Sequence, residues 1–346
     1  MMKRNRQFAS DNFSGICPEA WAALAEANTG HQANYGNDTW TQRAADLLRE
    51  IFETDCEVFF VFNGTAANSL ALASLCQPYH GIVCHELAHI ETSECGAPGF
   101  FSGGARILTL SGANGKIDPA ELARVVGKPR NIQRPPPRAL SVTQATETGT
   151  VYSVAEIQTL AEIACKSGMR VQMDGARFAN AVASLGVSPA EMTWRAGVDV
   201  LCFGGSKNGI ALGEAMVFFD RELGRDFDFR CKQAGQLASK MRFVSAPWVG
   251  MLKDGAWLRH AGHANEMAKR LEAGLRNISG VSIPFPVQSN TVLAKIPKPV
   301  EEKLRAHGWQ FFTGGITPVE SRLMCSWDTT PEDVDAFVAD LREIAG

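Results

Sequence analysis

The segment RVQMDGARFANAVASLG, residues 170–186, decides the fold that we expect for this chain. Arg170–Met173 has the apolar character of a short buried strand, and Phe178–Leu185 has the pattern of a helix that follows it. Asp174 stands at the end of the predicted strand. Ligands of open parallel sheets bind beyond the carboxyl ends of the strands, so Asp174 is placed to face a site. The alternative is that Asp174 only caps the following helix.

Short apolar strands and helical segments alternate on both sides of this segment, which predicts an α/β fold. Nearly continuous apolar strands are typical of a mainly parallel sheet that helices cover on both faces. The predicted strands are Val58–Phe62, Ile82–Cys84, Arg106–Leu110, Ala139–Thr143, Arg170–Met173, Val198–Phe203 and Ala215–Phe219. The predicted helices among them are Ala66–Leu75, Ser153–Ser167, Phe178–Leu185 and Pro189–Ala196.

The pattern changes after about Pro247, where a smaller α+β domain is expected to begin. A long helical pattern covers Trp248–Asn277, and shorter elements follow it. These are strands at Asn290–Ile296, Gln310–Phe312 and Arg322–Ser326, and helices at Pro299–His307 and Pro331–Ile344. We therefore expect an N-terminal arm and large α/β domain over residues 1–247 and a small C-terminal α+β domain over residues 248–346.

The composition is that of a folded protein with no general affinity for polyanions. Of the 346 residues, 34 are Lys or Arg and 37 are Asp or Glu, so the net charge is −3. This balance predicts no attraction to nucleic acid or to an anionic membrane. No apolar run approaches the about 20 residues of a membrane helix, and no secretory signal is recognisable. Nine cysteines without a C-x-x-C pair indicate free thiols in a reducing cytoplasm.

His85-Glu86-Leu87-Ala88-His89 matches the zinc-protease pattern H-E-x-x-H. On a helix, the two histidines would share a face and bind zinc, with Glu86 as the base. The match directly follows a predicted strand, which argues against that helix. A loop with two ordinary histidines and a cofactor site remain as other interpretations.

Asn63-Gly64-Thr65 lies between a predicted strand and a predicted helix. Glycine allows close approach to an anion, threonine adds a hydroxyl, and a helix N-terminus presents free N–H groups. The turn is therefore a candidate phosphate site, although a plain strand-to-helix turn explains it equally well.

Lys207 lies in a glycine-rich turn that follows the apolar strand Val198–Phe203. A lysine there can be a Schiff-base nucleophile, or it can be an ordinary turn lysine. A phosphate turn, an aspartate at a strand end and a lysine follow one another in this chain. Pyridoxal phosphate needs these three anchors for its phosphate, its ring nitrogen and its aldehyde.

In this order, the residues resemble fold-type-I pyridoxal-phosphate enzymes, and more closely the L-threonine aldolase family with its phenylserine aldolase relatives. The matching segments span most of the chain. They are Ala9-Ser10-Asp11-Asn12, Tyr35-Gly36-Asn37-Asp38, Asn63-Gly64-Thr65-Ala66-Ala67-Asn68, Ala88-His89, Asp174-Gly175-Ala176-Arg177, Ser206-Lys207 and Arg322.

The resemblance implies a role for each matching residue. The cofactor pyridoxal 5′-phosphate would be held by Lys207 (covalently), Gly64 and Thr65 (phosphate), Asp174 (ring nitrogen) and His89 (ring face). The substrate carboxylate would be bound by Ser10, Arg177 and Arg322. Tyr35 and Lys232 would reach the site from a neighbouring subunit, because family active sites lie between the subunits of a homodimer or homotetramer. No metal is implied.

Glu147 marks a departure from the family pattern. Better-known members carry a second active-site histidine in the segment that here reads Gln144-Ala145-Thr146-Glu147-Thr148-Gly149. Glu147 stands about where that histidine would fall. Two roles stay open for Glu147: it assists the substrate hydroxyl, or it only shapes the pocket. The candidate bases for that hydroxyl are His89, Glu147 or a water between them.

The resemblance implies reversible retro-aldol cleavage of L-threonine or L-allo-threonine to glycine and an aldehyde. Phenylserine-type substrates, and selectivity at the β-carbon, stay open. The alternatives are another fold-type-I enzyme, such as an aminotransferase or a β-eliminating lyase, and a zinc metalloprotease that uses His85 and His89.

Overall fold

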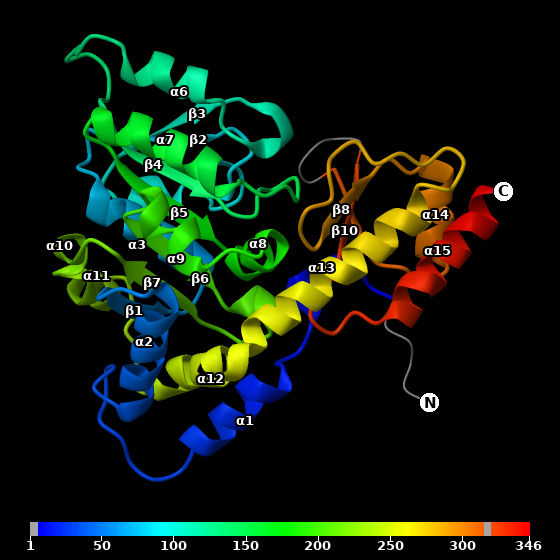
Figure 1. The fold of residues 1–346 in the computed structure, drawn as a ribbon, viewed down its shortest axis with the longest axis horizontal. Coiled ribbons are helices and arrows are strands. Elements are labelled where there is room, and N and C mark those ends of the chain that lie inside the picture. Colours follow the sequence, from blue (N-terminus) through cyan, green and yellow to red (C-terminus); the bar gives the residue numbers. More distant parts are fainter. Residues whose placement is uncertain (1–5, 315–319) are drawn as a thin grey trace.

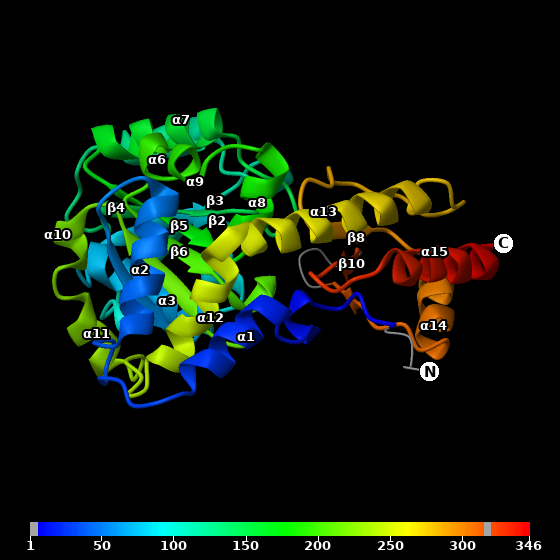
Figure 2. The same cartoon turned by 60° about the horizontal axis from the view of Figure 1, so that its bottom comes forward.

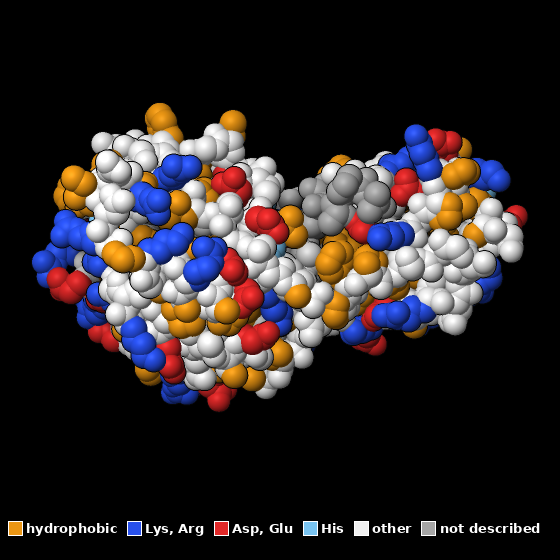
Figure 3. Space-filling model, turned by 90° about the horizontal axis from the view of Figure 1, so that it is seen from above, with side chains coloured by type: hydrophobic (Ala, Val, Ile, Leu, Met, Phe, Trp, Pro, Cys, Tyr) orange, Lys and Arg blue, Asp and Glu red, His pale blue; other side chains and the backbone are white. Residues whose placement is uncertain are grey.

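The computed structural model describes residues 6–314 and 320–346. The chain forms a large lobe around one sheet and a small lobe around another (Figure 1). A narrower waist separates the lobes in the space-filling view, and side chains of both charges lie on the large lobe (Figure 3). In the described parts of the chain, no helix is long and apolar enough to cross a membrane.

The elements follow in the order expected for an α/β fold with an appended α+β part. The helices are α1 (Pro18–Ala27), α2 (Thr39–Phe52), α3 (Gly64–Leu75), α4 (His89–Thr92), α5 (Ala97–Phe101), α6 (Pro119–Val126), α7 (Val154–Lys166), α8 (Phe178–Leu185), α9 (Pro189–Met192), α10 (Arg221–Gly224), α11 (Phe227–Gln233), α12 (Arg242–Leu252), α13 (Ala256–Leu275), α14 (Lys298–Ala306) and α15 (Pro331–Ala345). The strands are β1 (Glu57–Val61), β2 (Gly81–His85), β3 (Arg106–Leu110), β4 (Pro137–Thr143), β5 (Arg170–Gly175), β6 (Val200–Gly204), β7 (Glu214–Phe218), β8 (Thr291–Ala294), β9 (Phe312–Thr313) and β10 (Ser321–Met324).

The large sheet is mainly parallel, as predicted. Its strand order is β1-β7-β6-β5-β4-β2-β3, and the pairs among β2 to β6 are parallel. Only β7 runs antiparallel to its neighbours, β1 and β6. Each of the seven predicted strands is present, with ends displaced by two residues at most.

Both faces of this sheet are buried because helices pack on each. Along β6, Val200 and Cys202 point to the face that carries α3 and α11. Leu201 and Phe203 point to the opposite face, where α8 and α12 lie. This explains why the strands are apolar without alternation.

The antiparallel β7 brings three chain segments to one edge of the sheet. Its first residue, Glu214, pairs with Val61 at the end of β1 and with Gly204 at the end of β6. The Asn63 turn after β1 and the Lys207 turn after β6 therefore lie on either side of Glu214. Asp174, near the end of β5, lies at the same edge because β5 pairs in parallel with β6.

The small lobe packs α14 and α15 with the antiparallel sheet β8-β10-β9. The N-terminal end of the described chain belongs to this lobe: Phe8 is fully buried there against Trp309 and Phe337. The backbone N–H of Phe8 also donates to the carbonyl of Gln310 (2.7 Å). The chain then passes the site before it reaches α1.

The single helix predicted over Trp248–Asn277 is wrong. Two helices, α12 and α13, are separated by a turn at Lys253–Gly255. Asp254 and Gly255 adopt left-handed backbone conformations (φ 55° and 67°) that stop the helix. Aspartate and glycine tolerate this conformation better than most residues, so the local sequence permits the break.

Helix α13 connects the lobes (Figures 1 and 2). Trp248 and Trp257 pack in the core of the large lobe, whereas Met267 packs in that of the small lobe. The boundary between residues 247 and 248 stays a prediction, and this packing favours a boundary inside α13. All nine cysteines are free thiols, as predicted.

Candidate active site

A cavity of about 270 Å³ lies where the ends of β1, β5 and β6 meet. Its walls come from segments that are far apart in the sequence. Among the residues that line it are five predicted site residues: Gly64, Thr65, His89, Asp174 and Lys207.

The N-terminus of α3 forms one wall of the cavity. Asn63 caps the helix, since its side-chain oxygen accepts a hydrogen bond from the N–H of Ala66 (2.9 Å). The N–H groups of Gly64 and Thr65 have no partner within the helix because they belong to its first turn. A Cβ atom at Gly64 would meet no atom within 4 Å, so the backbone is open on this side. These features fit an anion such as phosphate.

Asp174 is buried and also lines the cavity. One carboxylate oxygen accepts from the side-chain amide of Asn68 (3.0 Å), and the other accepts from the N–H of Ala176 (3.1 Å). Helix α8 has Arg177 at its N-cap and no side-chain cap. The alternative in which Asp174 only caps that helix is therefore wrong.

His89 is coupled to Asp174 through a buried network. Its Nδ1 lies 2.9 Å from Oε1 of Glu94, and Asn68 donates to that same Glu94 oxygen (2.8 Å). The hydrogen bond with Glu94 raises the pKa of His89. Burial raises the pKa of Glu94 in turn. Asn68 thus holds two buried carboxyl groups with one amide, and its own oxygen accepts from Gln172 (3.0 Å).

The apparent zinc motif does not lie on one helix. Strand β2 runs through His85, and α4 begins only at His89. Both ring nitrogens of His85 have partners. Nε2 lies 3.2 Å from the carbonyl oxygen of Gly112, and Nδ1 accepts from the N–H of Leu87 (3.1 Å). The two histidines therefore lack the shared helix face that the metalloprotease interpretation requires.

Lys207 lies in a 3₁₀ turn, Ser206–Asn208, directly after β6. The turn is anchored by Asn208, whose side chain donates to the carbonyl of Trp257 (2.9 Å). It is also held at Gly209, whose carbonyl accepts from the N–H of Cys17 (2.8 Å). A Cβ at Gly204 would lie 2.5 Å from the carbonyl oxygen of Ala176, so only glycine allows this close approach. The turn fixes Lys207 in the cavity wall.

Arg177 is buried beside the cavity in an ion pair with Asp11. Its Nε donates to one oxygen of Asp11 (2.8 Å) and its Nη2 donates to the other (3.1 Å). Burial alone would raise the pKa of Asp11. The charges of Arg177 and Lys207, together with the hydrogen bonds from Arg177 and Asn290, outweigh that effect, so the pKa is lowered.

Arg322 comes from β10 in the small lobe and approaches the same place. Its Nη2 donates to the carbonyl of Ala9 (3.3 Å), but its buried Nε has no hydrogen-bond partner among residues 6–314 and 320–346. Burial, and then the charge of Arg177, lower the pKa of Arg322. The single carboxylate of Asp11 thus acts electrostatically on two guanidinium groups.

Ser10 is buried. It lies in the short segment that runs from Phe8, in the core of the small lobe, to α1 of the large lobe. Its hydroxyl accepts from the N–H of Asn12 (3.1 Å), which orders the short turn Asp11–Phe13. Asn12 lines the cavity two residues further along the chain, whereas Ser10 itself does not line it.

Glu147 is half-buried on the loop after β4, outside the set that lines the cavity. Its negative charge nevertheless acts on the predicted site: after the hydrogen bond with Glu94, it contributes to the raised pKa of His89. It also opposes the lowering of the pKa of Arg322.

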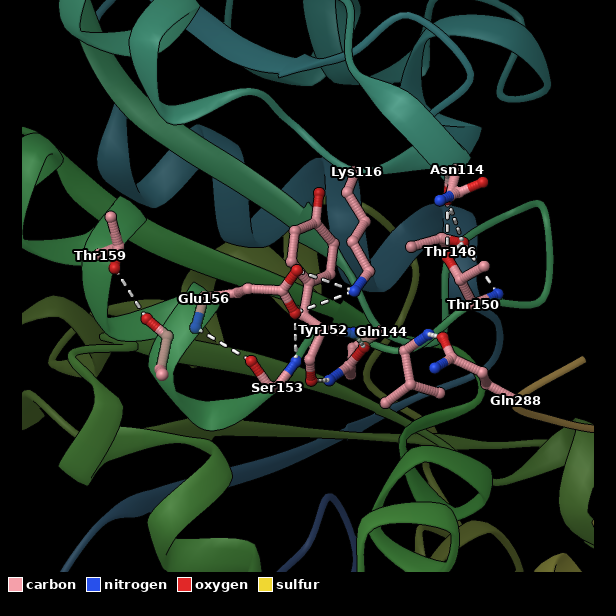
Figure 4. Close-up of polar contacts among 12 residues, drawn as sticks. Asn114, Lys116, Gln144, Thr146, Thr150, Tyr152, Ser153, Glu156, Thr159 and Gln288 are labelled. Atoms are coloured by element: carbon pink, nitrogen blue, oxygen red, sulfur yellow. Dashed lines mark hydrogen bonds and ion pairs between the residues drawn. The ribbon is translucent and has the colours of Figure 1, made fainter. Parts of the chain in front are cut away.

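The loop that carries Glu147 is held at both ends (Figure 4). Gln144 exchanges two hydrogen bonds with the backbone of Tyr152 (2.8 and 3.0 Å). The hydroxyl of Thr150 donates to the carbonyl of Asn114 (2.6 Å). These contacts fix the backbone on both sides of Glu147.

Tyr35 and Lys232 do not line the cavity of their own chain. They contact each other instead, with the ammonium of Lys232 4.4 Å from the ring centroid of Tyr35. Tyr35 is 41% exposed. A single chain leaves their predicted place in a neighbouring subunit untested.

Several residues of this site have no role in the predictions made from the sequence. Asp11, Asn68 and Glu94 are the buried partners of predicted residues. Glu214 lines the cavity itself, and burial raises its pKa to about 7. A carboxyl group at the head of the apolar strand 215–219 is the one signal that could have indicated Glu214.

The comparisons with known proteins agree with this geometry. The family model for β-eliminating lyases matches residues 7–298. A low specificity L-threonine aldolase of Pseudomonas sp. (strain NCIMB 10558) is 57% identical over 344 residues, 99% of each chain.

Solved structures give the same result. A threonine aldolase of Leishmania major superposes with a TM-score of 0.93 at 26% identity, covering 99% of this chain and 100% of that chain. A serine palmitoyltransferase of Sphingomonas wittichii shares the fold, with a TM-score of 0.74 at 16% identity over 98% of this chain and 86% of that one. The protein has the fold of fold-type-I pyridoxal-phosphate enzymes, is a lyase, and belongs to the L-threonine aldolase family.

Proposed function

We propose that this chain cleaves L-threonine and L-allo-threonine reversibly to glycine and acetaldehyde, with pyridoxal 5′-phosphate bound at Lys207. Phenylserine-type β-hydroxy-α-amino acids are further candidate substrates. The observation that carries the proposal is one cavity that contains Lys207, Asp174 and the N-terminus of α3. Two relatives that are 57% and 56% identical to this chain carry the name low specificity L-threonine aldolase, which supports the same reaction.

The residues in the cavity fit this cofactor. Gly64 and Thr65 would hold the phosphate, Asp174 the ring nitrogen, His89 the ring face and Lys207 the aldehyde carbon. When bound there, pyridoxal phosphate would supply an electron sink for the bond that breaks at Cα. The buried position of Asp174 suits this role, because a carboxylate keeps a ring nitrogen protonated best where water is excluded.

The two arginines would bind the substrate carboxylate. Arg177 is already positioned by Asp11. The Nε of Arg322, which has no partner among the residues that the structure describes, is a donor that a carboxylate oxygen would satisfy. Ser10 would add a hydroxyl. Fixing the carboxylate would set the direction of the Cα–Cβ bond, and that direction selects which bond breaks.

The β-hydroxyl proton would pass to His89, to Glu147 or to a water between them. Glu94 accepts from the Nδ1–H of His89, which leaves Nε2 of the neutral ring free to take a proton. Glu147 acts electrostatically on His89 and on Arg322. Both residues therefore stay candidates for the base.

The complete site would need a second copy of the chain. Tyr35 and Lys232 stand outside the cavity of their own chain, on an exposed surface that also carries Phe229. In a homodimer or homotetramer, these side chains would approach the phosphate and substrate of a neighbour. We expect this assembly to work in the cytoplasm, where free thiols persist.

The absorbance spectrum of the purified protein tests the proposal first. A yellow band that borohydride removes, with the label mapped to Lys207, is the expected result. Lys207→Ala should lose both the label and turnover, by about a thousandfold or more. A colourless protein that takes up no added pyridoxal phosphate would contradict the proposal.

The products then separate the aldolase from its alternatives. L-threonine should give glycine and acetaldehyde in equal amounts. Release of ammonia and a keto acid would favour a β-eliminating lyase, whose family model also matches this chain.

A further inference from the structure

Glu214 is a buried carboxyl group between the predicted phosphate turn and the predicted cofactor lysine. As the first residue of β7, it pairs with the last residues of β1 and β6. One carboxyl oxygen accepts from the N–H of Gly205 (2.6 Å), and the other accepts from the hydroxyl of Ser206 (2.8 Å). Its side chain lines the same cavity as Gly64 and Thr65.

The groups around Glu214 compensate its negative charge only in part. Lys207 is the cation that acts on it, whereas Asp174, on β5, adds a like charge. On β6, Cys202 is a neutral thiol, because burial raises the pKa of Cys202 well above its ordinary value. Asn63 and Thr65, which line the same cavity at the start of α3, carry no charge. The α12 residues Val244 and Trp248, which lie against Gly213 and Gly205, carry none either.

We propose that Glu214 takes up a proton when the phosphate group of the cofactor binds, and that Ser206 then turns its hydroxyl from Glu214 to the phosphate. The inference rests on the proposed function, since it assumes that the cavity takes pyridoxal phosphate.

The charges explain why the proton is needed. A phosphate carries about −1.5 to −2 at neutral pH, so an ionised Glu214 in the same buried cavity would repel it. A proton from solvent removes that repulsion. The protonated Glu214 can donate to Ser206 Oγ, and this frees the Ser206 O–H to donate to a phosphate oxygen.

The sign of the pH dependence follows from linkage. Burial already raises the pKa of Glu214 to about 7 in the free protein, and a bound phosphate raises it further. Below pH 7 the group is largely protonated before binding, so binding takes up little. Above pH 7 binding takes up as much as one proton, and the affinity falls by up to tenfold per pH unit.

The test compares the wild type with Glu214→Gln, whose amide has the shape of the protonated acid. The probe is pyridoxamine 5′-phosphate, which has no aldehyde and forms no covalent bond with Lys207. Binding to the full-length apoprotein is measured by calorimetry at pH 8 in two buffers of different ionisation enthalpy. Protonation of the ring nitrogen near Asp174 contributes to both proteins alike, so the difference in proton uptake reports Glu214.

At pH 8, we expect the wild type to bind as much as one proton more than Glu214→Gln when the probe binds. At pH 6, we expect the two proteins to bind equal numbers of protons. The ratio of the two dissociation constants should rise by up to tenfold per pH unit above pH 7. Equal uptake at both pH values would overturn the inference. Failure of both proteins to bind would overturn the proposed function instead.

Two further variants keep the test decisive. If Glu214→Gln does not fold, Glu214→Ser serves as the neutral protein, and the same difference is expected. Ser206→Ala should bind more weakly at every pH and still take up the proton, because Glu214 is retained. Unchanged affinity in Ser206→Ala would overturn the part of the inference that assigns the phosphate contact to Ser206.

Discussion

Arg177 and Asp11 form a bidentate ion pair inside the protein, although 166 residues separate them in the chain. The pair joins the N-terminal arm to the large lobe beside the cavity. Asn290, which precedes β8 of the small lobe, also donates to Asp11 (3.1 Å). One carboxylate thus ties three parts of the chain together at the place where the substrate carboxylate is proposed to bind.

Replacing Asp11 by Asn should destabilise the protein strongly. Removing one partner of a buried pair leaves a buried charge uncompensated, which costs about 3–5 kcal/mol. The free energy of unfolding in urea measures the loss. The matched control is Asp335→Asn, because Asp335 forms a similar bidentate pair with Arg270 on the surface. The exposed pair should contribute less than about 1 kcal/mol. Equal effects of the two substitutions would contradict the role of burial.

The stability that Asp11 provides should also depend on pH. Because the pKa of Asp11 is lowered in the folded protein, its contribution is present above the unfolded pKa near 3.8 and is lost as the pH falls through the lower folded value. Acid unfolding of Asp11→Asn should therefore be less steep than that of the wild type. Identical acid transitions would show that Asp11 does not take part.

Glu214 should give the opposite pH dependence in the protein without cofactor. Its pKa is raised on folding from 4.5 to about 7. The contribution of Glu214 to the free energy of unfolding is therefore most favourable below pH 4.5. Between pH 4.5 and 7, the free energy of unfolding falls by about 3 kcal/mol because of this group. Glu214→Gln should remove that loss, so its advantage over the wild type should grow over this range and then level off. The exposed Glu162→Gln is the control, and a flat difference for Glu214→Gln would refute the assignment.

The strands could be predicted from the sequence because the sheet is covered on both faces. Val200–Gly204 is apolar at four successive positions, and that pattern alone identifies a buried strand. The break between α12 and α13 was harder, since Asp254 and Gly255 are tolerated in helices as well as in turns. Helix α2 was not predicted, although Asp38 caps it with a hydrogen bond to the N–H of Thr41 (2.8 Å).

Only those site residues that belong to a sequence motif were predicted. Lys207, Asp174 and the Gly64 turn each stand at a strand end, and their order in the chain indicates one cofactor. Their partners are fixed by tertiary contacts instead. Asn68 reaches Glu94 across 26 residues and Asp174 across 106, and no local pattern encodes such distances.

Replacing Asn68 by Leu tests how far these partners matter. The substitution keeps a similar volume and removes the only side-chain amide between Asp174 and Glu94 in the described structure. Each buried carboxyl that loses a hydrogen bond costs about 1–3 kcal/mol. We expect lower stability and weaker cofactor binding, as measured by urea unfolding and by titration with pyridoxal phosphate. Asn180→Leu, which removes a buried amide bonded to Asn265 away from the cavity, should lower stability alone.

Glu147→Gln separates the two roles that stay open for Glu147. The hydrogen bond with Glu94 dominates the raised pKa of His89, and the charge of Glu147 adds to it. Removing that charge should lower the pKa of His89, so the limb of the kcat/KM profile that belongs to His89 should move to lower pH. We expect kcat on the plateau to stay within about tenfold of the wild type, because His89 and Glu94 are intact. A loss of about 10²-fold or more at every pH is what removal of a general base produces, and it would make Glu147 the base. The ratio of L-threonine to L-allo-threonine cleavage, measured on the same variant, reports whether Glu147 shapes the pocket around the β-carbon.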